Sequence, residues 1–241
     1  MNLILDFGNT RVKAGVFDGK DLAVHKIFDS ATQLIDHLPA FPPIDKCLIG
    51  SVTGAHEAVF ETLKKKFNTS LFSTTTPVPL KNLYQSALTL GSDRMAAAVG
   101  AYSFYPNSNV LTIDAGTCIK YNFVNADNEY LGGAISPGIP MRLQAMHHYT
   151  HALPEIKADE NYEKLTGQNT RESLLSGAII GAALEADGMI SRYKTLYPAL
   201  QIVITGGDSP YLCKQLKNRF FANQNILLYG LNTILNFNIE K

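Results

Sequence analysis

Two short segments of this chain open in the same way, and their repetition limits the folds that it can adopt. LDFGNT at residues 5–10 and IDAGT at 113–117 each combine an apolar strand, an Asp, any residue, a Gly and a hydroxyl residue in a turn, followed by another strand. The aspartates Asp6 and Asp114 are 108 positions apart (114 − 6). Later elements follow the same order, since CLIGSV leads into a helix in the first half and QIVITGGD does so in the second. We interpret this as an internal duplication.

The first half predicts a β-hairpin from LILDF and VKAGVFDG, with a third strand near Ala23–Phe28. A helix in SATQLIDHL, a buried strand in CLIGSV and a helix in GAHEAVFETLKKKF follow. After a linker that contains Pro77 and Pro79, SDRMAAAVGAYSFY predicts a helix with Ser92 as its N-cap. The first domain is expected to span 1–108.

The second half, 109–241, predicts a second hairpin from NVLTIDAGT and CIKYNFV. SPGIPMRLQAMHHY predicts a helix opened by Pro137 and Gly138, and NILLYG a last strand before a final helix at Gly230–Phe237, which can pack on either domain. NTRESLLSGAIIGAALEADGMISRY predicts a long helix that is apolar almost all round. Such a helix must be buried on more than one side, at a subunit interface or in the core.

Composition excludes several classes of function. Lys plus Arg and Asp plus Glu both number 21, a formal net charge of zero, and Lys64–Lys66 is a short basic run that indicates a solvated helix end. A sequence-independent nucleic-acid binder would need a clustered basic excess. Three widely spaced cysteines do not form a disulfide framework and are typical of a reducing compartment. The N-terminus lacks the features of a signal peptide, and no window resembles a membrane span, so we expect a cytoplasmic protein.

The chemistry of the repeated turn is that of a phosphate site. Glycine lets the backbone approach a phosphate oxygen, the turn N–H groups and hydroxyl donate to it, and the Asp offers a hard oxygen to a neutralising cation. A single Asp-x-Gly-Thr turn also occurs in ordinary hairpins, whereas two copies can face each other across a cleft and hold a triphosphate. Thr205-Gly206-Gly207-Asp208 is a third candidate element, or a simple strand-to-helix turn. The chain has neither G-x-x-x-x-G-K-[ST] nor G-x-G-x-x-G.

These motifs together carry a resemblance to a known family. The pair DFGNT and DAGT, with LGSDR between them and GGAISPGI after them, is similar to type III pantothenate kinases of the sugar kinase, Hsp70 and actin superfamily. The resemblance covers nearly the whole chain in the right order. It implies an α/β fold of two duplicated ribonuclease H-like (actin-like ATPase) domains, with mixed sheets flanked by helices. It also implies a homodimer that phosphorylates pantothenate from Mg²⁺-ATP, with a monovalent cation, K⁺ or NH₄⁺.

The resemblance further implies roles for individual residues. ATP phosphates would be bound by Asp6, Phe7, Gly8, Asn9, Thr10, Arg11, Val12, Lys13 and Thr117. Pantothenate would be bound by Tyr84, Gly91, Ser92, Asp93, Arg94 and, across the dimer interface, Thr170. Asp93 would be the catalytic base and Asp114 the ligand of the monovalent cation. The family often has an Asp shortly after the second turn, and this chain has Asn122 there instead.

The chemistry of Asp93 and Arg94 agrees with these roles. Phosphoryl transfer needs positioning, charge neutralisation and a group that accepts the hydroxyl proton. Asp93 is expected at a helix start, where the dipole favours a carboxylate, and Arg94 can clamp a substrate carboxylate with two parallel hydrogen bonds. The alternative is plain N-capping by this segment with a surface ion pair.

Two other features can mislead. His147, His148 and His151 form an HHxxH cluster, in which His147 and His151 have the i, i+4 spacing of helical metal ligands. No third protein ligand is evident and Pro154 soon ends the segment, so a solvated or substrate-adjacent loop is favoured over zinc. Cys118 directly follows the second turn, and on a returning strand it indicates a small packing residue rather than a nucleophile.

The leading hypothesis is therefore an ATP-dependent kinase that makes 4′-phosphopantothenate, the first step towards coenzyme A. Alternatives are another small-molecule kinase of the same superfamily, acting on a sugar or an acid, and a regulatory ATP-binding protein without catalysis. An actin-like filament protein is disfavoured by the short chain and the LGSDR segment. The presence of Asp6, Asp93 and Asp114 together favours catalysis over binding alone.

Overall fold

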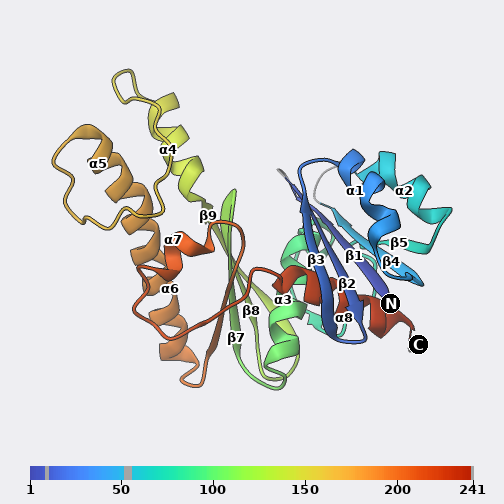
Figure 1. Ribbon diagram of the computed structural model, residues 1–241. Helices are drawn as coiled ribbons and strands as arrows, with labels where there is room; N and C mark the ends of the chain where they lie inside the picture. The colour runs from blue at the N-terminus through green and yellow to red at the C-terminus, as the bar shows by residue number, and fades with distance from the viewer. Residues whose placement is uncertain (9–10, 52–55, 240–241) are drawn as a thin grey trace. The chain divides into compact units, whose positions relative to one another are not determined.

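The chain folds into two compact units that are not simple halves of the sequence. The computed structural model describes residues 1–8, 11–51 and 56–239 (Figure 1). The first unit contains 1–107, 127–131 and 225–241, and the second contains 108–126 and 132–224. The chain thus leaves the first unit after residue 107 and returns to it twice. The last helix belongs to the first unit.

The first unit is built on a mixed sheet of five strands. These are β1 (Asn2–Phe7), β2 (Val12–Asp18), β3 (Asp21–Phe28), β4 (Lys46–Ser51) and β5 (Asn68–Leu71). Their spatial order is β3-β2-β1-β4-β5. β1, β2 and β3 are antiparallel neighbours, whereas β4 and β5 run parallel to β1, as the predicted hairpin and later strand require.

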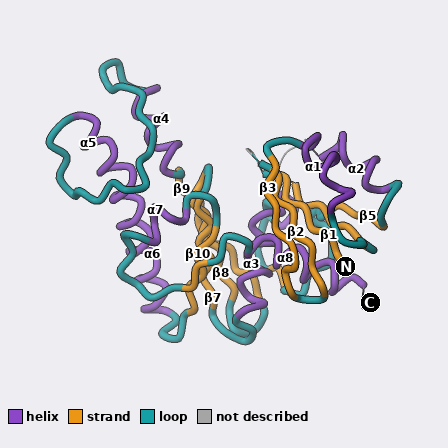
Figure 2. The backbone as a smooth tube through the Cα atoms, viewed as in Figure 1, coloured by secondary structure: helices purple, strands orange, loops and turns teal. Residues whose placement is uncertain are grey.

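Helices cover both faces of this sheet, as the backbone tube in Figure 2 shows. On one face, α1 (Ala31–His37), the 3₁₀ turn η1 (Leu38–Ala40) and α2 (Glu57–Lys64) form an apolar core with alternate residues of β1, β2 and β4. On the other face lie α3 (Ser92–Phe104) and α8 (Ile226–Ile239). Gly15 of β2 and Gly50 of β4 leave room there for Leu228 and Leu231, since a Cβ on either glycine would come within 3.3 Å or less of them.

α3 and α8 pack with their backbones in direct contact. A Cβ on Gly100 would lie 2.0 Å from the carbonyl oxygen of Ile226, and one on Gly230 would lie 1.8 Å from that of Ala96. The predicted strand in NILLYG is therefore wrong, because these residues begin α8, which starts at Ile226. Short apolar runs fit a strand or a buried helix equally well, and only packing against α3 decides between them.

The second unit repeats the strand order of the first. Its strands are β7 (Val110–Ala115), β8 (Cys118–Val124), β9 (Glu129–Pro137, which begins in the first unit), β10 (Gln201–Thr205) and β11 (Phe221–Ala222). They lie in the order β11-β10-β7-β8-β9. Numbered from one in each unit, both sheets are 3-2-1-4-5, which supports the inferred duplication. The start of β9 also pairs in parallel with β6 (Lys81–Asn82).

The helices of the second unit share one large apolar core with its sheet. They are α4 (Ile139–His148), α5 (Thr170–Leu175), the π-helical turn η4 (Ser176–Ile180), α6 (Gly181–Leu196) and α7 (Ser209–Cys213). The long predicted helix is thus present at 170–196, interrupted by one π turn. By length and composition alone this run is apolar enough to cross a membrane, but half of its most apolar stretch is buried inside the protein, and a core helix of a globular protein has the same properties.

Candidate functional site

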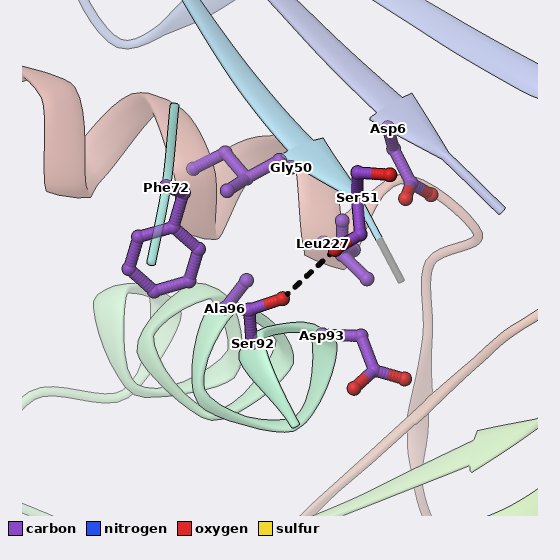
Figure 3. Close-up of a pocket in the computed structure, with 9 residues that line it drawn as sticks. Asp6, Gly50, Ser51, Phe72, Ser92, Asp93, Ala96 and Leu227 are labelled. Atoms are coloured by element: carbon purple, nitrogen blue, oxygen red, sulfur yellow. Dashed lines mark hydrogen bonds between the residues drawn. The ribbon is translucent and has the colours of Figure 1, made fainter. Parts of the chain in front are cut away.

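Two predicted site carboxylates line one pocket of the first unit. Asp6 lies near the end of β1 and Asp93 in the first turn of α3. Both line a small pocket whose other walls come from β4, α3 and α8, together with Phe72. Figure 3 shows the two carboxylates on the side of the pocket away from Phe72. The sequence predicted both residues as site residues. It did not show that they line the same pocket, because they lie far apart in the chain.

The start of α3 is held at the edge of the sheet by a serine. The hydroxyl of Ser92 donates to the carbonyl oxygen of Ser51, at the end of β4, over 3.3 Å (Figure 3). The prediction that Ser92 is the N-cap of this helix is wrong, because the N-cap is Gly91 and Ser92 is already helical. A Cβ on Gly91 would meet Oδ1 of Asp93 at 2.5 Å, and that oxygen also accepts from the Arg94 N–H at 2.9 Å. Gly91 therefore provides the space that the Asp93 carboxylate occupies.

Arg94 is buried, with 5% of its surface exposed, which excludes a surface ion pair. Its guanidinium carbon lies 5.5 Å from the ring centre of Tyr84, within cation–π range. The Tyr84 ring is in turn 6.3 Å from that of Tyr130. Two residues that the resemblance assigns to pantothenate are therefore brought together, and Tyr130 is a neighbour that sequence reasoning missed.

The stretch from Asp6 to Lys13 divides into buried and accessible residues. Phe7 and Val12 belong to the apolar core of the first unit, so their backbone groups alone are available to a nucleotide. The N–H of Gly8 donates to the carbonyl oxygen of Arg11 at 3.2 Å, and Lys13 lies opposite Asp6 in the β1–β2 register. The predicted residues Asn9 and Thr10 lie outside the described part of the chain.

A second, larger pocket adjoins the first and shares Phe72 and Ser92 with it. Its remaining walls are Ser73, Thr74, Thr76, Val78, Asn82, Ala87, Leu90 and Met95. Sequence reasoning assigned this segment to a linker. The run of hydroxyl residues before Pro77 is the sequence feature that could have indicated a polar pocket wall.

In the second unit, the turn Ala115-Gly116-Thr117 lies between two glycine-containing segments. A Cβ on Gly206 would come within 2.1 Å of the Ala115 carbonyl oxygen, and one on Gly138 within 2.0 Å of that of Gly116. The N–H of Asp208 donates to the Ala115 carbonyl over 2.9 Å. The GGAISPGI and TGGD motifs thus converge on this turn. Thr117 itself is exposed.

Asp114 has a charged protein partner. Its Oδ2 lies 2.8 Å from Nζ of Lys120, and only 13% of the Asp114 side chain and 21% of the Lys120 side chain are exposed. Asp208 lies close enough to Asp114 for the negative charge of the Asp114 carboxylate to act on it. Burial raises the pKa of Asp208, and the negative charges of Glu160 and Asp114 raise it further.

Thr170, the predicted substrate contact on the second unit, is exposed at the first residue of α5. Its helix is capped by Asn169, whose side chain accepts from the Glu172 N–H at 2.9 Å.

Sequence reasoning also missed a polar cluster inside the second unit. Glu185 of α6 accepts from the hydroxyls of Tyr121 and Ser136, each at 3.0 Å, and from the guanidinium of Arg142. Burial raises the pKa of Glu185, but these donors outweigh it and leave that pKa below its ordinary value. The cluster joins α6 to β8, β9 and α4.

The histidine cluster has no metal-like geometry. Nδ1 of His147 lies 2.8 Å from the carbonyl oxygen of Leu153. Within residues 1–8, 11–51 and 56–239, no three His, Cys, Asp or Glu side chains are grouped closely enough to hold a metal ion. Cys118 is a half-buried free thiol.

Comparison with known proteins agrees on one family. The family model for type III pantothenate kinase matches residues 2–192. The type III pantothenate kinase of Christiangramia forsetii is 42% identical over 241 residues, covering 99% of each chain. That of Flavobacterium johnsoniae is 37% identical over 244 residues, covering 100% of both chains.

Among solved structures, a Campylobacter jejuni protein described as a candidate Baf family transcriptional activator has a TM-score of 0.63 and 20% identity, covering 99% of this chain and 100% of that one. A ROK family glucokinase from Streptomyces griseus, solved with glucose and AMPPNP, has a TM-score of 0.53 and 12% identity, covering 96% and 97%. At these identities the likeness shows the fold alone. It confirms the predicted α/β fold with mixed sheets flanked by helices.

Proposed function

Because this chain belongs to the type III pantothenate kinase family, we propose that it transfers the γ-phosphoryl group of ATP to the primary hydroxyl of pantothenate. The O–P bond to the β-phosphate breaks, a bond from phosphorus to the acceptor oxygen forms, and ADP and 4′-phosphopantothenate are the products. The observation that carries the proposal is the shared pocket of Asp6 and Asp93. Phosphoryl transfer needs such carboxylates, one for the metal-bound phosphates and one for the acceptor proton.

We assign Asp93 the role of the base that accepts the proton of the acceptor hydroxyl. Its carboxylate stands in the first turn of α3, where the helix dipole stabilises negative charge. The hydrogen bond from the Arg94 N–H to Oδ1 holds the Asp93 carboxylate in place at the start of the helix.

We assign Arg94 and Tyr84 to the carboxylate end of pantothenate. A planar guanidinium makes two parallel hydrogen bonds to a carboxylate, and the ring beside it limits how the guanidinium turns. Gly91, Ser92 and Thr170 complete the proposed acceptor contacts.

We assign the ATP phosphates to the hairpin that runs from Asp6 to Lys13 and to Thr117 of the second hairpin. ATP is handled by this family as a complex with a divalent ion, and Mg²⁺ prefers carboxylate oxygens, water and phosphate. The Asp6 carboxylate, half-buried at a strand end, fits such an ion. The ion would neutralise phosphate charge.

We also propose a cytoplasmic homodimer. The helical run 170–196 keeps Leu184 56% exposed and Leu196 72% exposed, although its other face is core. Exposed apolar side chains on a buried helix are typical of a subunit interface. Sedimentation at micromolar concentration tests the assembly, and a fully active monomer would contradict a site completed by Thr170 of a second copy.

The direct test is ATP turnover with and without pantothenate, with the phosphorylated product identified by mass spectrometry. We expect ADP release only when pantothenate is present, and a product heavier by one phosphoryl group. Glucose, N-acetylmannosamine and pantoate serve as competing acceptors. Faster turnover with a sugar would assign the chain to another small-molecule kinase, and ATP binding without any acceptor-dependent turnover would favour a regulatory role.

A further inference from the structure

The carboxylate that the resemblance assigns to a monovalent cation already has an ammonium group beside it. Asp114 and Lys120 are directly opposite each other in the β7–β8 register, and such pairs project from the same face of a sheet. Oδ2 of Asp114 lies 2.8 Å from Nζ of Lys120. Oδ1 lies against Gly206, where an added Cβ would be 2.6 Å away. Both carboxylate oxygens therefore have close protein neighbours.

The face of the hairpin that carries this pair holds no net charge. Successive side chains of a strand point to opposite faces. Residues of the two strands that enter the apolar core are Leu111, Ile113, Ala115, Ile119, Tyr121 and Phe123. On the opposite face, Thr112 and Asn122 are both 0% exposed and neutral. The Asp114 carboxylate and the Lys120 ammonium then sum to zero charge.

The surroundings of this pair are acidic. Asp208 has a raised pKa because of burial first, and then because of the charges of Glu160 and Asp114. Without Lys120, Asp114 and Asp208 would be neighbouring carboxylates that need a cation between or beside them. A free monovalent ion would meet that need, but so does a lysine ammonium, which is an ammonium ion with one hydrogen replaced by carbon.

We infer that Lys120 is the permanent cation of the second Asp-x-Gly-Thr turn, so that this enzyme works without a bound K⁺ or NH₄⁺. The inference rests on the proposed kinase function and disagrees with the cation requirement that the resemblance implies. A tethered ammonium is present at any salt composition and loses little further translational freedom when it pairs with Asp114. Lys120 is thus a positioning residue for this turn.

The first test uses the wild-type protein. Pantothenate-dependent turnover is measured in chloride salts of K⁺, NH₄⁺, Na⁺ and tetramethylammonium at equal ionic strength. We expect the four rates to agree within about twofold. A rate in K⁺ that exceeds the Na⁺ rate by about tenfold or more would overturn the inference.

The second test removes the tethered cation. Lys120→Met should lose at least about tenfold in rate in Na⁺, and K⁺ or NH₄⁺ should restore it. KCl should also raise the melting temperature of the ligand-free variant above its value in NaCl, because an ion that binds only the folded state stabilises it. Wild type should show no such difference. Lys194→Met is the matched control, because the Lys194 ammonium donates to the Asn218 side chain in the wild type and not to a carboxylate. This variant should respond to no cation.

The outcomes separate the possible roles of Lys120. If Lys120→Met loses the same factor in rate in all four salts and its KM for ATP rises, then Lys120 is a phosphate ligand and the inference is overturned. If Lys120→Met fails to fold, the wild-type salt series still decides. If pantothenate is not phosphorylated at all, the proposed function fails, whereas the melting temperatures still test the cation role.

Discussion

The hydroxyl of Ser92 donates to the carbonyl oxygen of Ser51 across 3.3 Å, which ties the first turn of α3 to the end of β4. Asp93 is the next residue along that turn, and Asp6 lies on β1, the strand paired with β4. One hydrogen bond therefore connects the elements that carry the two carboxylates of the pocket.

Ser92→Ala tests this connection. Losing the bond should cost about 0.5–1.5 kcal/mol of stability, and a small displacement of Asp93 should lower kcat by about tenfold. Thermal melts and initial rates measure the two effects. Ser103→Ala is the control, because Ser103 is also in α3 and donates to a backbone carbonyl, that of Gly100, at 2.7 Å. It should lose similar stability and keep its kcat, and an equal fall in kcat for both variants would contradict the positioning role.

Asp93→Asn tests the base. Asparagine keeps the shape and the hydrogen bond from the Arg94 N–H but cannot accept the acceptor proton as a carboxylate does. Turnover should fall by about 10²- to 10⁴-fold, whereas ATP affinity by calorimetry and the melting temperature should stay near wild type. Asp18→Asn, at the exposed end of β2, should change none of the three. Near-normal turnover in Asp93→Asn would remove Asp93 from the chemistry.

Arg94→Lys tests the assignment of the carboxylate end of pantothenate. Lysine keeps the charge but loses the planar fork and its stacking on Tyr84. We expect the KM for pantothenate to rise by about tenfold or more at saturating ATP, with the KM for ATP unchanged. Arg192→Lys, on the exposed part of α6, is the control. Equal increases in the KM values of both substrates would instead indicate a general loss of structure around α3.

Gly230→Ala tests the packing of α8 on α3. An added Cβ would lie 1.8 Å from the Ala96 carbonyl oxygen, so the helices must separate. We expect a loss of about 1–3 kcal/mol or more in the free energy of unfolding, measured in denaturant. Gly188→Ala in α6 has nothing within 4 Å of the new Cβ and should gain about 0.5–1 kcal/mol from helix propensity. A stable Gly230→Ala would show that α8 can move away from α3.

Local patterns in the sequence were sufficient for much of the fold. The two hairpins, the strand in CLIGSV and the helix that begins at LGSDR follow from alternation, glycine turns and helix periodicity, which depend on neighbours within a few residues. The repeated Asp-x-Gly openings predicted a duplication, and the matching 3-2-1-4-5 strand order supports it. The family motifs led to Asp6, Asp93 and Asp114 before any contact was known.

Tertiary structure decided what depends on residues far apart in the chain. NILLYG was predicted as a strand, because an apolar run has no local signal that excludes one, yet glycine contacts at Gly100 and Gly230 make it part of a buried helix. Its return to the first unit also places Leu227 and Leu231 in the pocket of Asp6 and Asp93.

The ion pair at the second turn also depends partly on the sequence and partly on the tertiary structure. The sequence determined that an Asp and a Lys stand on the two strands of a hairpin. Only the register of β7 and β8 placed Lys120 opposite Asp114, because a shift of one residue would have turned the lysine to the apolar face.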